Sequence, residues 1–278
     1  MAAKRRSKRK RAISENEVVL PVVTKGMVGG KYKPLSDHEI EQIHQTTLDV
    51  LENIGMTNPL PQFKEVALEQ GCNFTDQGRL CFPRSLVEDV IARAGRDFVM
   101  YGRDPKHDIE MSDKKVHLYG GGEAVTILDL GATTYRPSTI NDVYDIARVV
   151  DYLDNIHSYS RLVVATEFTD LLKTDINTAY ASVVGTTKHT ALTFASGKHV
   201  KPTIEMLEMI AGGEGKFLER PFCHGGGCTV VSPLRYGTDN CEVAIASIEM
   251  NAPIWVVTGS YTHLTLPTTP TGERAARS

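Results

Sequence analysis

The side chains best placed for chemistry follow runs of apolar, strand-forming residues. Glu167 follows the first such run, Lys198 the second and Ser232 the third. In enzymes that alternate strands and helices, reacting groups stand at the carboxyl ends of parallel strands and in the loops beyond them. We therefore expect Glu167, Lys198 and Ser232 at a substrate-binding site. Taken singly, each could also be an ordinary loop residue, and residue types alone do not name a reaction.

A second candidate is the segment Cys223–Cys228, whose thiols and imidazole are side chains that zinc prefers. The spacing is poor for a metal, because neighbouring residues of a strand point to opposite faces. No second cluster supplies further ligands, so the sequence predicts packed thiols and no metal site. The glycine runs 120–122 and 225–227 lack the Lys-Ser/Thr of a phosphate-binding loop and predict tight turns. The catalytic residue stays unknown, since neither GxSxG nor HExxH occurs.

The elements that must position these side chains recur about every 33 residues between 138 and 259. Helical patterns separate the strand-like runs, which predicts crossover connections and a parallel sheet. No GxGxxG follows the first run, so a (β/α)8 TIM-type barrel is favoured over a doubly wound dinucleotide fold. Four units make about half of a barrel, so this α/β fold is expected to be incomplete. The strand-like runs are Ile156–Ala165, Thr190–Ala195, Phe222–Val231 and Ile254–Thr258.

Residues 31–137 have a different pattern and predict an α+β region ahead of the repeats. A helix begins after Ser36, because Glu39 three residues later completes a capping box. A second helix is expected over about 60–70. A third opens at Pro83, with Leu86, Val90 and Ile91 expected to be buried. Short β-prone runs between 97 and 136 predict a small antiparallel region.

The two ends of the chain differ in composition from its body. The first 14 residues hold seven basic side chains and no acid, so residues 1–30 are expected to form a disordered basic tail. Residues 260–278 show no periodicity and resemble translated sequencing-adapter read-through, so this tail is expected not to be native. Five cysteines without a CxxC pattern or a secretory signal favour a reducing, cytoplasmic location. No apolar run is long enough to cross a membrane.

Three separate motifs resemble the trimethylamine methyltransferase family. The first is GKYKPLSDHEIEQIH, which starts at Gly30, and the second is YRPSTINDV, which starts at Tyr135. The third is VSPLRY from Val231, ahead of a helix that ends in NAPI. The resemblance covers about residues 4–259 and implies that the chain is the N-terminal part of a (β/α)8 enzyme. An Arg-rich start is common in the family, which explains the basic tail without nucleic acid.

The resemblance also implies a reaction. Family members move a methyl group from a methylated amine to the cobalt of a separate corrinoid protein, and the enzyme binds no cofactor directly. Some members use pyrrolysine for trimethylamine, whereas others take quaternary amines such as glycine betaine. The pyrrolysine position lies beyond Gly259, so the substrate stays open between the two and this chain alone is expected to be inactive. A homo-oligomer is also expected.

Within that reaction the candidate residues have expected roles. Glu167 could offset the positive charge of the substrate, and Lys198 could hold a carboxylate such as that of a betaine. Trp255 could attract a quaternary ammonium through its ring face, and Ser232 completes the substrate-binding set. Two alternatives stay open. One is a binding or interaction protein with a basic arm, and the other is a different small-molecule enzyme with a TIM barrel.

Overall fold

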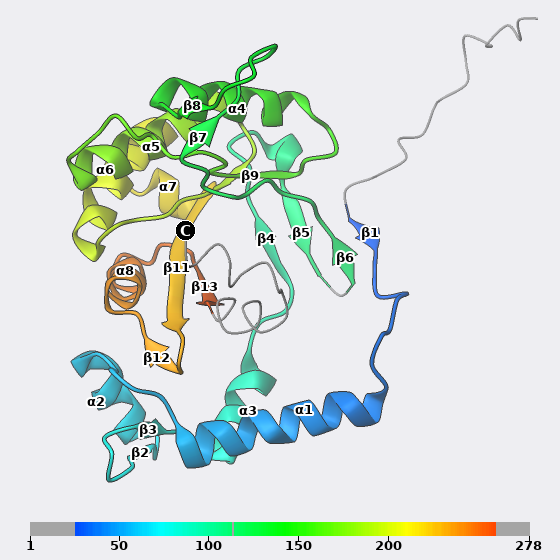
Figure 1. Cartoon of the computed structure of the whole chain (residues 1–278), viewed down its shortest axis with the longest axis vertical. Helices are drawn as coiled ribbons and strands as arrows, with labels where there is room; N and C mark the ends of the chain where they lie inside the picture. Colours follow the sequence, from blue (N-terminus) through cyan, green and yellow to red (C-terminus); the bar gives the residue numbers. More distant parts are fainter. Residues whose placement is uncertain (1–25, 113, 260–278) are drawn as a thin grey trace, which may run out of the picture.

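The computed structural model describes residues 26–112 and 114–259 (Figure 1). Most of the predicted basic tail and the whole of the predicted tail 260–278 lie outside these residues. The described chain has two regions that differ in their strands. Residues before Ile140 form helices and two- or three-residue antiparallel strand pairs, whereas later residues form a parallel sheet with helical crossovers.

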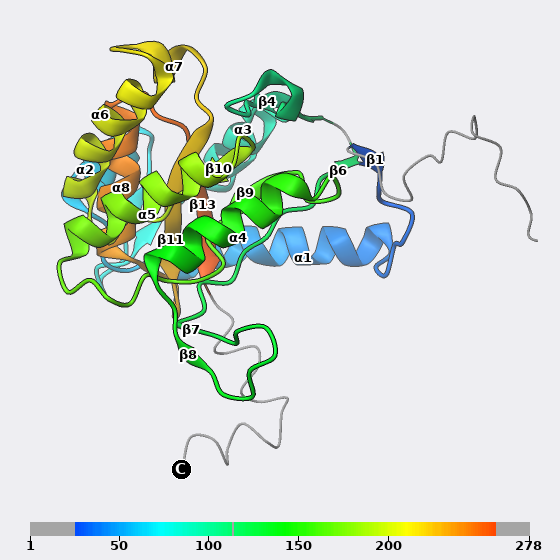
Figure 2. The same ribbon diagram turned by 90° about the horizontal axis from the view of Figure 1, so that it is seen from above.

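The first region combines helices with short antiparallel strand pairs. Its helical elements are α1 (Asp37–Asp49), η1 (Val50–Ile54), α2 (Pro61–Glu69), α3 (Arg84–Arg93) and η2 (Pro105–His107). Its strand pairs are β1 (Met27–Val28) with β6 (Lys115–Val116), β2 (Asn73–Phe74) with β3 (Leu80–Cys81), β4 (Phe98–Met100) with β5 (Ile109–Met111), and β7 (Thr126–Ile127) with β8 (Arg136–Pro137). All four pairs are antiparallel. Figure 2 shows that the β7–β8 hairpin projects from the body.

The capping box at Ser36 is confirmed. The backbone N–H of Ser36 donates to a Glu39 carboxylate oxygen at 2.8 Å, and the Ser36 hydroxyl accepts from the Glu39 backbone N–H. The expected burial of α3 is wrong in part, because Val90 is 53% and Ile91 42% exposed. Leu86 is partly buried, so α3 contacts the rest of the described chain with only part of its apolar stripe.

The second region is a parallel sheet. Its strands are β9 (Ser158–Ser160), β10 (His189–Ala191), β11 (Cys223–Val231) and β13 (Ile254–Gly259), and they lie in that order. The prediction of parallel strands is confirmed at all four positions, although β9 and β10 are shorter than the apolar runs that predicted them. The short strand β12 (Arg235–Tyr236) pairs antiparallel with the far end of β11.

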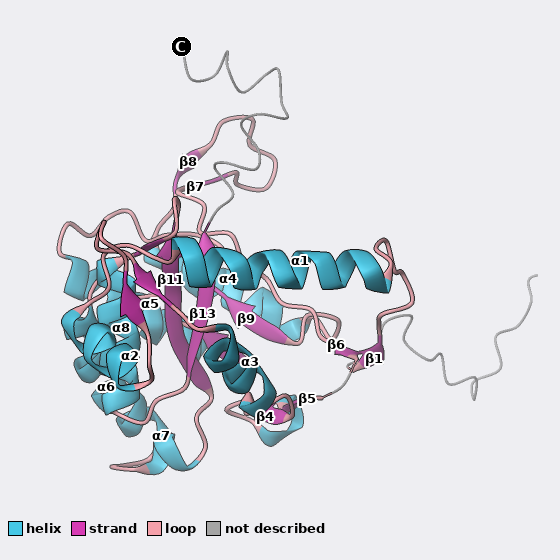
Figure 3. Cartoon of the chain, turned by 90° about the horizontal axis from the view of Figure 1, so that it is seen from below, coloured by secondary structure: helices cyan, strands magenta, loops and turns pink. Residues whose placement is uncertain are grey.

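Helices connect these strands and cover one face of the sheet. They are α4 (Ile140–Tyr152), α5 (Leu171–Gly185), η3 (Gly197–His199), α6 (Val200–Ala211), α7 (Lys216–Glu219) and α8 (Thr238–Glu249). In Figure 3, α5, α6 and α8 gather on one side of β11 and β13. The largest core cluster fills the space between them, with Leu207, Phe217 and Val243 almost fully buried. Among the described helices, none is long and apolar enough to cross a membrane.

The order of the strands bears on the fold class. In a doubly wound sheet the strand order reverses, whereas in a barrel each new strand pairs with the preceding one. The order β9-β10-β11-β13 is sequential, as expected for the first part of a barrel. A closed barrel needs eight strands, so the (β/α)8 fold stays a prediction.

Candidate functional site

The face of the sheet opposite the helices borders a cavity of about 270 Å³. Alternate strand residues line it, because side chains in a strand point to opposite faces in turn. Ser158 and Ser160 come from β9, His189 and Ala191 from β10 and His224 from β11. The remaining lining residues are Met100, Ile109, Met111, His117, Tyr119, Tyr159 and Trp255. The lining is mainly apolar, with imidazoles as its main polar groups.

Two histidines form a hydrogen-bonded pair in this cavity. Nδ1 of His189 is 2.7 Å from the carbonyl oxygen of Tyr101, and its Nε2 is 2.8 Å from Nδ1 of His224. A carbonyl only accepts, so His189 carries its proton on Nδ1 and accepts at Nε2 from His224. Nε2 of His224 is then unprotonated. Burial lowers the pKa of His189 to about 4 and that of His224 to about 3, so both imidazoles are neutral at pH 7.

The cavity spans the whole length of the short strands β9 and β10. Ser158 and Ser160 are the first and last residues of β9, and His189 and Ala191 are those of β10. In barrels the amino ends of the strands are associated with stability, and chemistry occurs at the carboxyl ends. The cavity alone therefore does not identify the reactive end.

A charged cluster lies beyond the carboxyl ends of β9 and β10. One carboxylate oxygen of Glu123 is 2.9 Å from Nη2 of Arg161 and accepts the hydroxyl hydrogen of Thr193 at 2.9 Å. Arg161 directly follows β9, and Thr193 lies two residues beyond β10. Glu123 arrives from the first region, in a segment that runs beside β9 through the bridges Tyr119–Ser158 and Ala124–Val163. In barrel enzymes, substrates bind at this end of the strands.

The sequence analysis does not predict the Glu123 cluster, although the neighbouring glycine run indicates an unusual backbone there. Glu123 directly follows the glycine run 120–122 and has a φ of 54°, a left-handed conformation that non-glycine residues rarely adopt. The sequence predicts only a tight turn there. The histidine pair also had a signal, because His189 and His224 are 35 residues apart, close to the repeat length.

The sequence-predicted site residues are not brought together. Lys198 is exposed in η3, and Ser232 is partly buried just after β11. Trp255 is 36% exposed and lines the cavity near the amino end of β13. Its ring centroid is 6.1 Å from that of His224. Their substrate-binding roles remain predictions.

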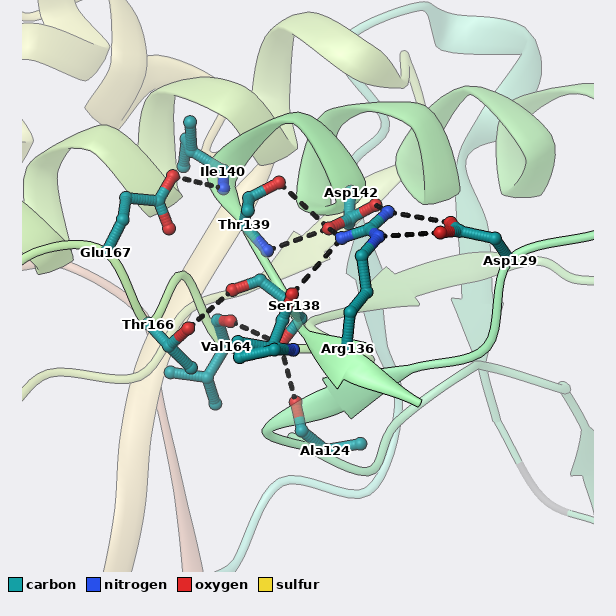
Figure 4. Close-up of polar contacts among 11 residues, drawn as sticks. Ala124, Asp129, Arg136, Ser138, Thr139, Ile140, Asp142, Val164, Thr166 and Glu167 are labelled. Carbon is teal, nitrogen blue, oxygen red and sulfur yellow. Dashed lines mark hydrogen bonds and ion pairs between the residues drawn. The ribbon is translucent and has the colours of Figure 1, made fainter. Parts of the chain in front are cut away.

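Glu167 contacts the start of a helix (Figure 4). Its Oε1 accepts the backbone N–H of Ile140 at 2.7 Å, where the helix dipole favours a negative charge. Beside it, the Arg136 guanidinium donates to Asp129 and to Asp142, and Asp142 also accepts from Thr139. Arg136 holds the pKa of Asp142 well below its usual range. The network fixes the amino end of α4, so Glu167 has a structural contact besides its predicted role.

Another carboxylate orients an imidazole at the same end of the sheet. Oδ2 of Asp175 on α5 lies 2.6 Å from Nδ1 of His199 and accepts the backbone N–H of Ala195 at 2.8 Å. The pair fastens the loop after β10 to α5. Because a carboxylate only accepts, Nδ1–H of His199 is the donor in this contact.

Cys223 and His224 lie on opposite faces, as their adjacency predicts. Cys223 packs in the helix-side core and His224 in the cavity. Across residues 26–112 and 114–259, no group of three His, Cys, Asp or Glu side chains is arranged to hold a metal ion.

Comparisons with known proteins give a family. The family described as trimethylamine methyltransferase (MTTB) matches residues 2–275. Trimethylamine methyltransferase MttB of Desulfitobacterium hafniense is 31% identical over 220 residues, which are 79% of this chain and 44% of that protein. The Methanosarcina thermophila protein of the same name is 24% identical, over 80% of this chain and 47% of its own length. A glycine betaine methyltransferase of D. hafniense is 21% identical over 197 residues, which are 70% of this chain and 40% of that protein. The chain thus spans about half the length of the curated relatives it matches.

Proposed function

The chain belongs to the trimethylamine methyltransferase family, and from that premise we propose that it serves in methyl transfer from trimethylamine or a quaternary amine such as glycine betaine. The acceptor in this proposal is the cobalt of a corrinoid carried by a separate protein. The observation that carries the proposal is the family match over residues 2–275. Relatives named for trimethylamine and for glycine betaine leave both donors in view.

The arrangement of the strands supports a barrel as the framework for this reaction. Sequential parallel strands with helices on one face are the arrangement expected at the start of a (β/α)8 barrel. The remaining strands would have to continue from the free edge of β13 and close against the segment beside β9. Closure would enclose the histidine cavity and bring further side chains over the Glu123 cluster.

The two donors differ in the proton that the reaction needs. The methyl carbon leaves its nitrogen while the electron pair of the C–N bond stays on nitrogen, so a quaternary donor departs as a neutral tertiary amine without a proton. Trimethylamine has to react as its protonated ammonium form, which departs as neutral dimethylamine. The corrinoid supplies the electron pair that forms the new bond to carbon. The residues of the chain have to bind the cation, orient it and exclude water. Carboxylates and aromatic rings suit the cation, and Glu123, Tyr119 and Trp255 offer them on this side of the sheet.

Location and assembly are part of the proposal. All five cysteines are free thiols, which supports a reducing compartment such as the cytoplasm. The exposed apolar residues of α1 and α3, among them Ile40, Ile43 and Val90, support a further covering surface. A second copy in a homo-oligomer would provide one, and so would more chain of the family's length.

The test is methyl transfer to free cob(I)alamin, followed by the change of its absorption spectrum to that of methylcobalamin. Trimethylamine and glycine betaine are offered separately to a version with the full length of the relatives. Transfer from at least one donor is expected, and transfer from neither contradicts the proposal. The 278-residue chain alone is expected to show no turnover.

A further inference from the structure

The β7–β8 hairpin projects from the body and carries apolar side chains that are open to solvent (Figure 2). We propose that this hairpin is a docking element for the separate protein that carries the methyl acceptor. In this proposal Leu130 and Tyr135 enter an apolar depression in the surface of that protein. The inference rests on the proposed function and names the surface on which its second protein binds.

The hairpin rises from the end of the sheet at which barrel enzymes bind their substrates. It follows the segment that runs parallel to β9, where Ala124 is bridged to Val163 beyond the last residue of β9. After the hairpin, the Ser138 hydroxyl donates to the Val164 carbonyl at 2.7 Å. The Ser138 carbonyl accepts the backbone N–H of Thr166 at 3.0 Å. Figures 2 and 3 show the hairpin extending from the side at which β13 ends, so a protein that approaches this end meets it.

The hairpin presents apolar side chains to solvent. Leu130 is fully exposed, Tyr135 is 69% exposed and Leu128 is 43% exposed. Single apolar residues on a surface are common, whereas here three of them project from one short element. Tyrosine is also enriched among the residues that contribute most to protein–protein binding. Among the described residues these side chains join none of the core clusters, which favours a role in binding.

The tip of the hairpin has a fixed conformation. The backbone N–H of Ala132 donates to the Asp129 carbonyl at 2.9 Å and closes a tight turn that contains Leu130. Gly131 in this turn has a φ of 78°, a left-handed value that glycine adopts without steric cost. The Asp129 carboxylate accepts from the Arg136 guanidinium at 2.8 Å, and Arg136 also pairs with α4. A preformed element loses less conformational entropy on binding than a mobile loop does.

The proposed reaction requires a protein at this end of the sheet. In a direct displacement the cobalt forms its bond to the methyl carbon while the C–N bond breaks, so the cobalt has to reach the bound donor. The carrier protein must therefore cover the carboxyl ends of the strands, where substrates bind in barrel enzymes. Between Leu130 and Tyr135 the sequence holds no charged residue, and the flanking Asp129 and Arg136 pair with each other. The matching surface of the carrier is accordingly apolar.

The experiment compares two methyl acceptors on the full-length version, with the donor that the unaltered protein uses. One acceptor is free cob(I)alamin, which needs no docking, and the other is a corrinoid-loaded carrier protein from Desulfitobacterium hafniense, the organism of the 31% identical relative. Leu130→Ser should raise the carrier concentration for half-maximal rate by about tenfold or more and leave transfer to free cob(I)alamin unchanged. Tyr135→Ser should act in the same direction. The control is Met209→Ser, on an exposed residue of α6, and it should change neither.

An unchanged half-maximal concentration in both hairpin variants would overturn the inference, and so would a carrier that the unaltered protein uses no better than free cob(I)alamin. An equal loss of transfer to free cob(I)alamin would also overturn it, because the hairpin would then serve the donor site. So would a smaller particle mass of Leu130→Ser in light scattering, which would assign the hairpin to contacts between copies of this chain. The proposed function fails separately. If neither acceptor is methylated, titration calorimetry of the carrier on the unaltered protein and on Leu130→Ser still decides the docking.

Discussion

The two faces of the parallel sheet are built from the same strands and differ in nearly every other respect. On the helix side, Cys223 packs in a closed apolar cluster with Phe217 and Phe222. On the other side, Ser158, His189 and His224 border a cavity that is also lined by residues of the first region, such as Met100 and Ile109. The period of two in a strand creates this division. The helix face is a completed core, whereas the opposite face keeps polar groups and space that a fold alone does not require.

The largest effect should come from the helix face. Phe217→Ala removes a ring that is 2% exposed and packs edge-to-face on Phe222 at a centroid distance of 5.2 Å. We expect a loss of about 3–5 kcal/mol in the free energy of unfolding, measured by urea denaturation. The neighbouring Leu218 is 37% exposed, so Leu218→Ala serves as the control and should cost much less. Equal losses would show that the helix-side core is not packed as described.

The histidine pair on the opposite face should make the free energy of unfolding depend on pH. His189 and His224 have pKa values lowered to about 4 and about 3 by burial, below the usual value of 6.5. The unfolded chain therefore binds more protons between pH 6.5 and about 4, and stability falls as the pH decreases through that window. The slope is at most about 1.4 kcal/mol per pH unit for each histidine.

The matched variant is His189→Asn, which can still donate to the Tyr101 carbonyl but does not titrate. Its urea midpoint should change less between pH 7 and pH 5 than that of the unaltered chain. His38 is exposed, and His38→Asn should leave the slope unchanged. A variant slope as steep as the original would mean that the pair is not buried and neutral.

The smallest effect is expected at the edge between the regions. Arg136→Gln removes the guanidinium that joins the exposed Asp129 to the largely buried Asp142. Arg136 itself is 40% exposed, so solvent screens the contact and the loss of overall stability should be small. The pKa of Asp142 should rise toward its usual value, measured by an NMR titration of the carboxyl carbon. An unchanged Asp142 pKa would contradict the contact drawn in Figure 4.

Local patterns predicted the elements of the framework but not which side chains meet across it. The capping box at Ser36 and the four parallel strands depend on neighbouring residues and apolar periodicity, which a sequence displays directly. The burial of Val90 depends on what packs against α3, and its prediction was wrong. The meeting of Glu123, Arg161 and Thr193 depends on a segment that crosses to β9, and no local pattern encodes that crossing.

The same reason explains the predicted substrate residues. A rule about strand ends selects Glu167, Lys198 and Ser232 equally, because it contains no information about direction or partners. The contact of Glu167 with Ile140 joins residues 27 positions apart and depends on where the amino end of α4 lies. Trp255 was selected as an aromatic residue, and the structure places it on the histidine cavity.

If methyl transfer depends on the face of the sheet opposite the helices, and stability on the helix face, substitutions on the two faces should have different effects. A matched pair of substitutions tests it: Thr193→Val on the first face and Thr203→Val in α6, where the fully buried hydroxyl donates to the His199 carbonyl at 2.8 Å. The measurement is the rate of methyl transfer to cob(I)alamin per folded full-length protein, with the melting temperature alongside. Thr193→Val should lower the rate about tenfold at an unchanged melting temperature. Thr203→Val should lower the melting temperature and leave the rate per folded protein unchanged. An unchanged rate in Thr193→Val, or a lower rate in Thr203→Val alone, would contradict the claim.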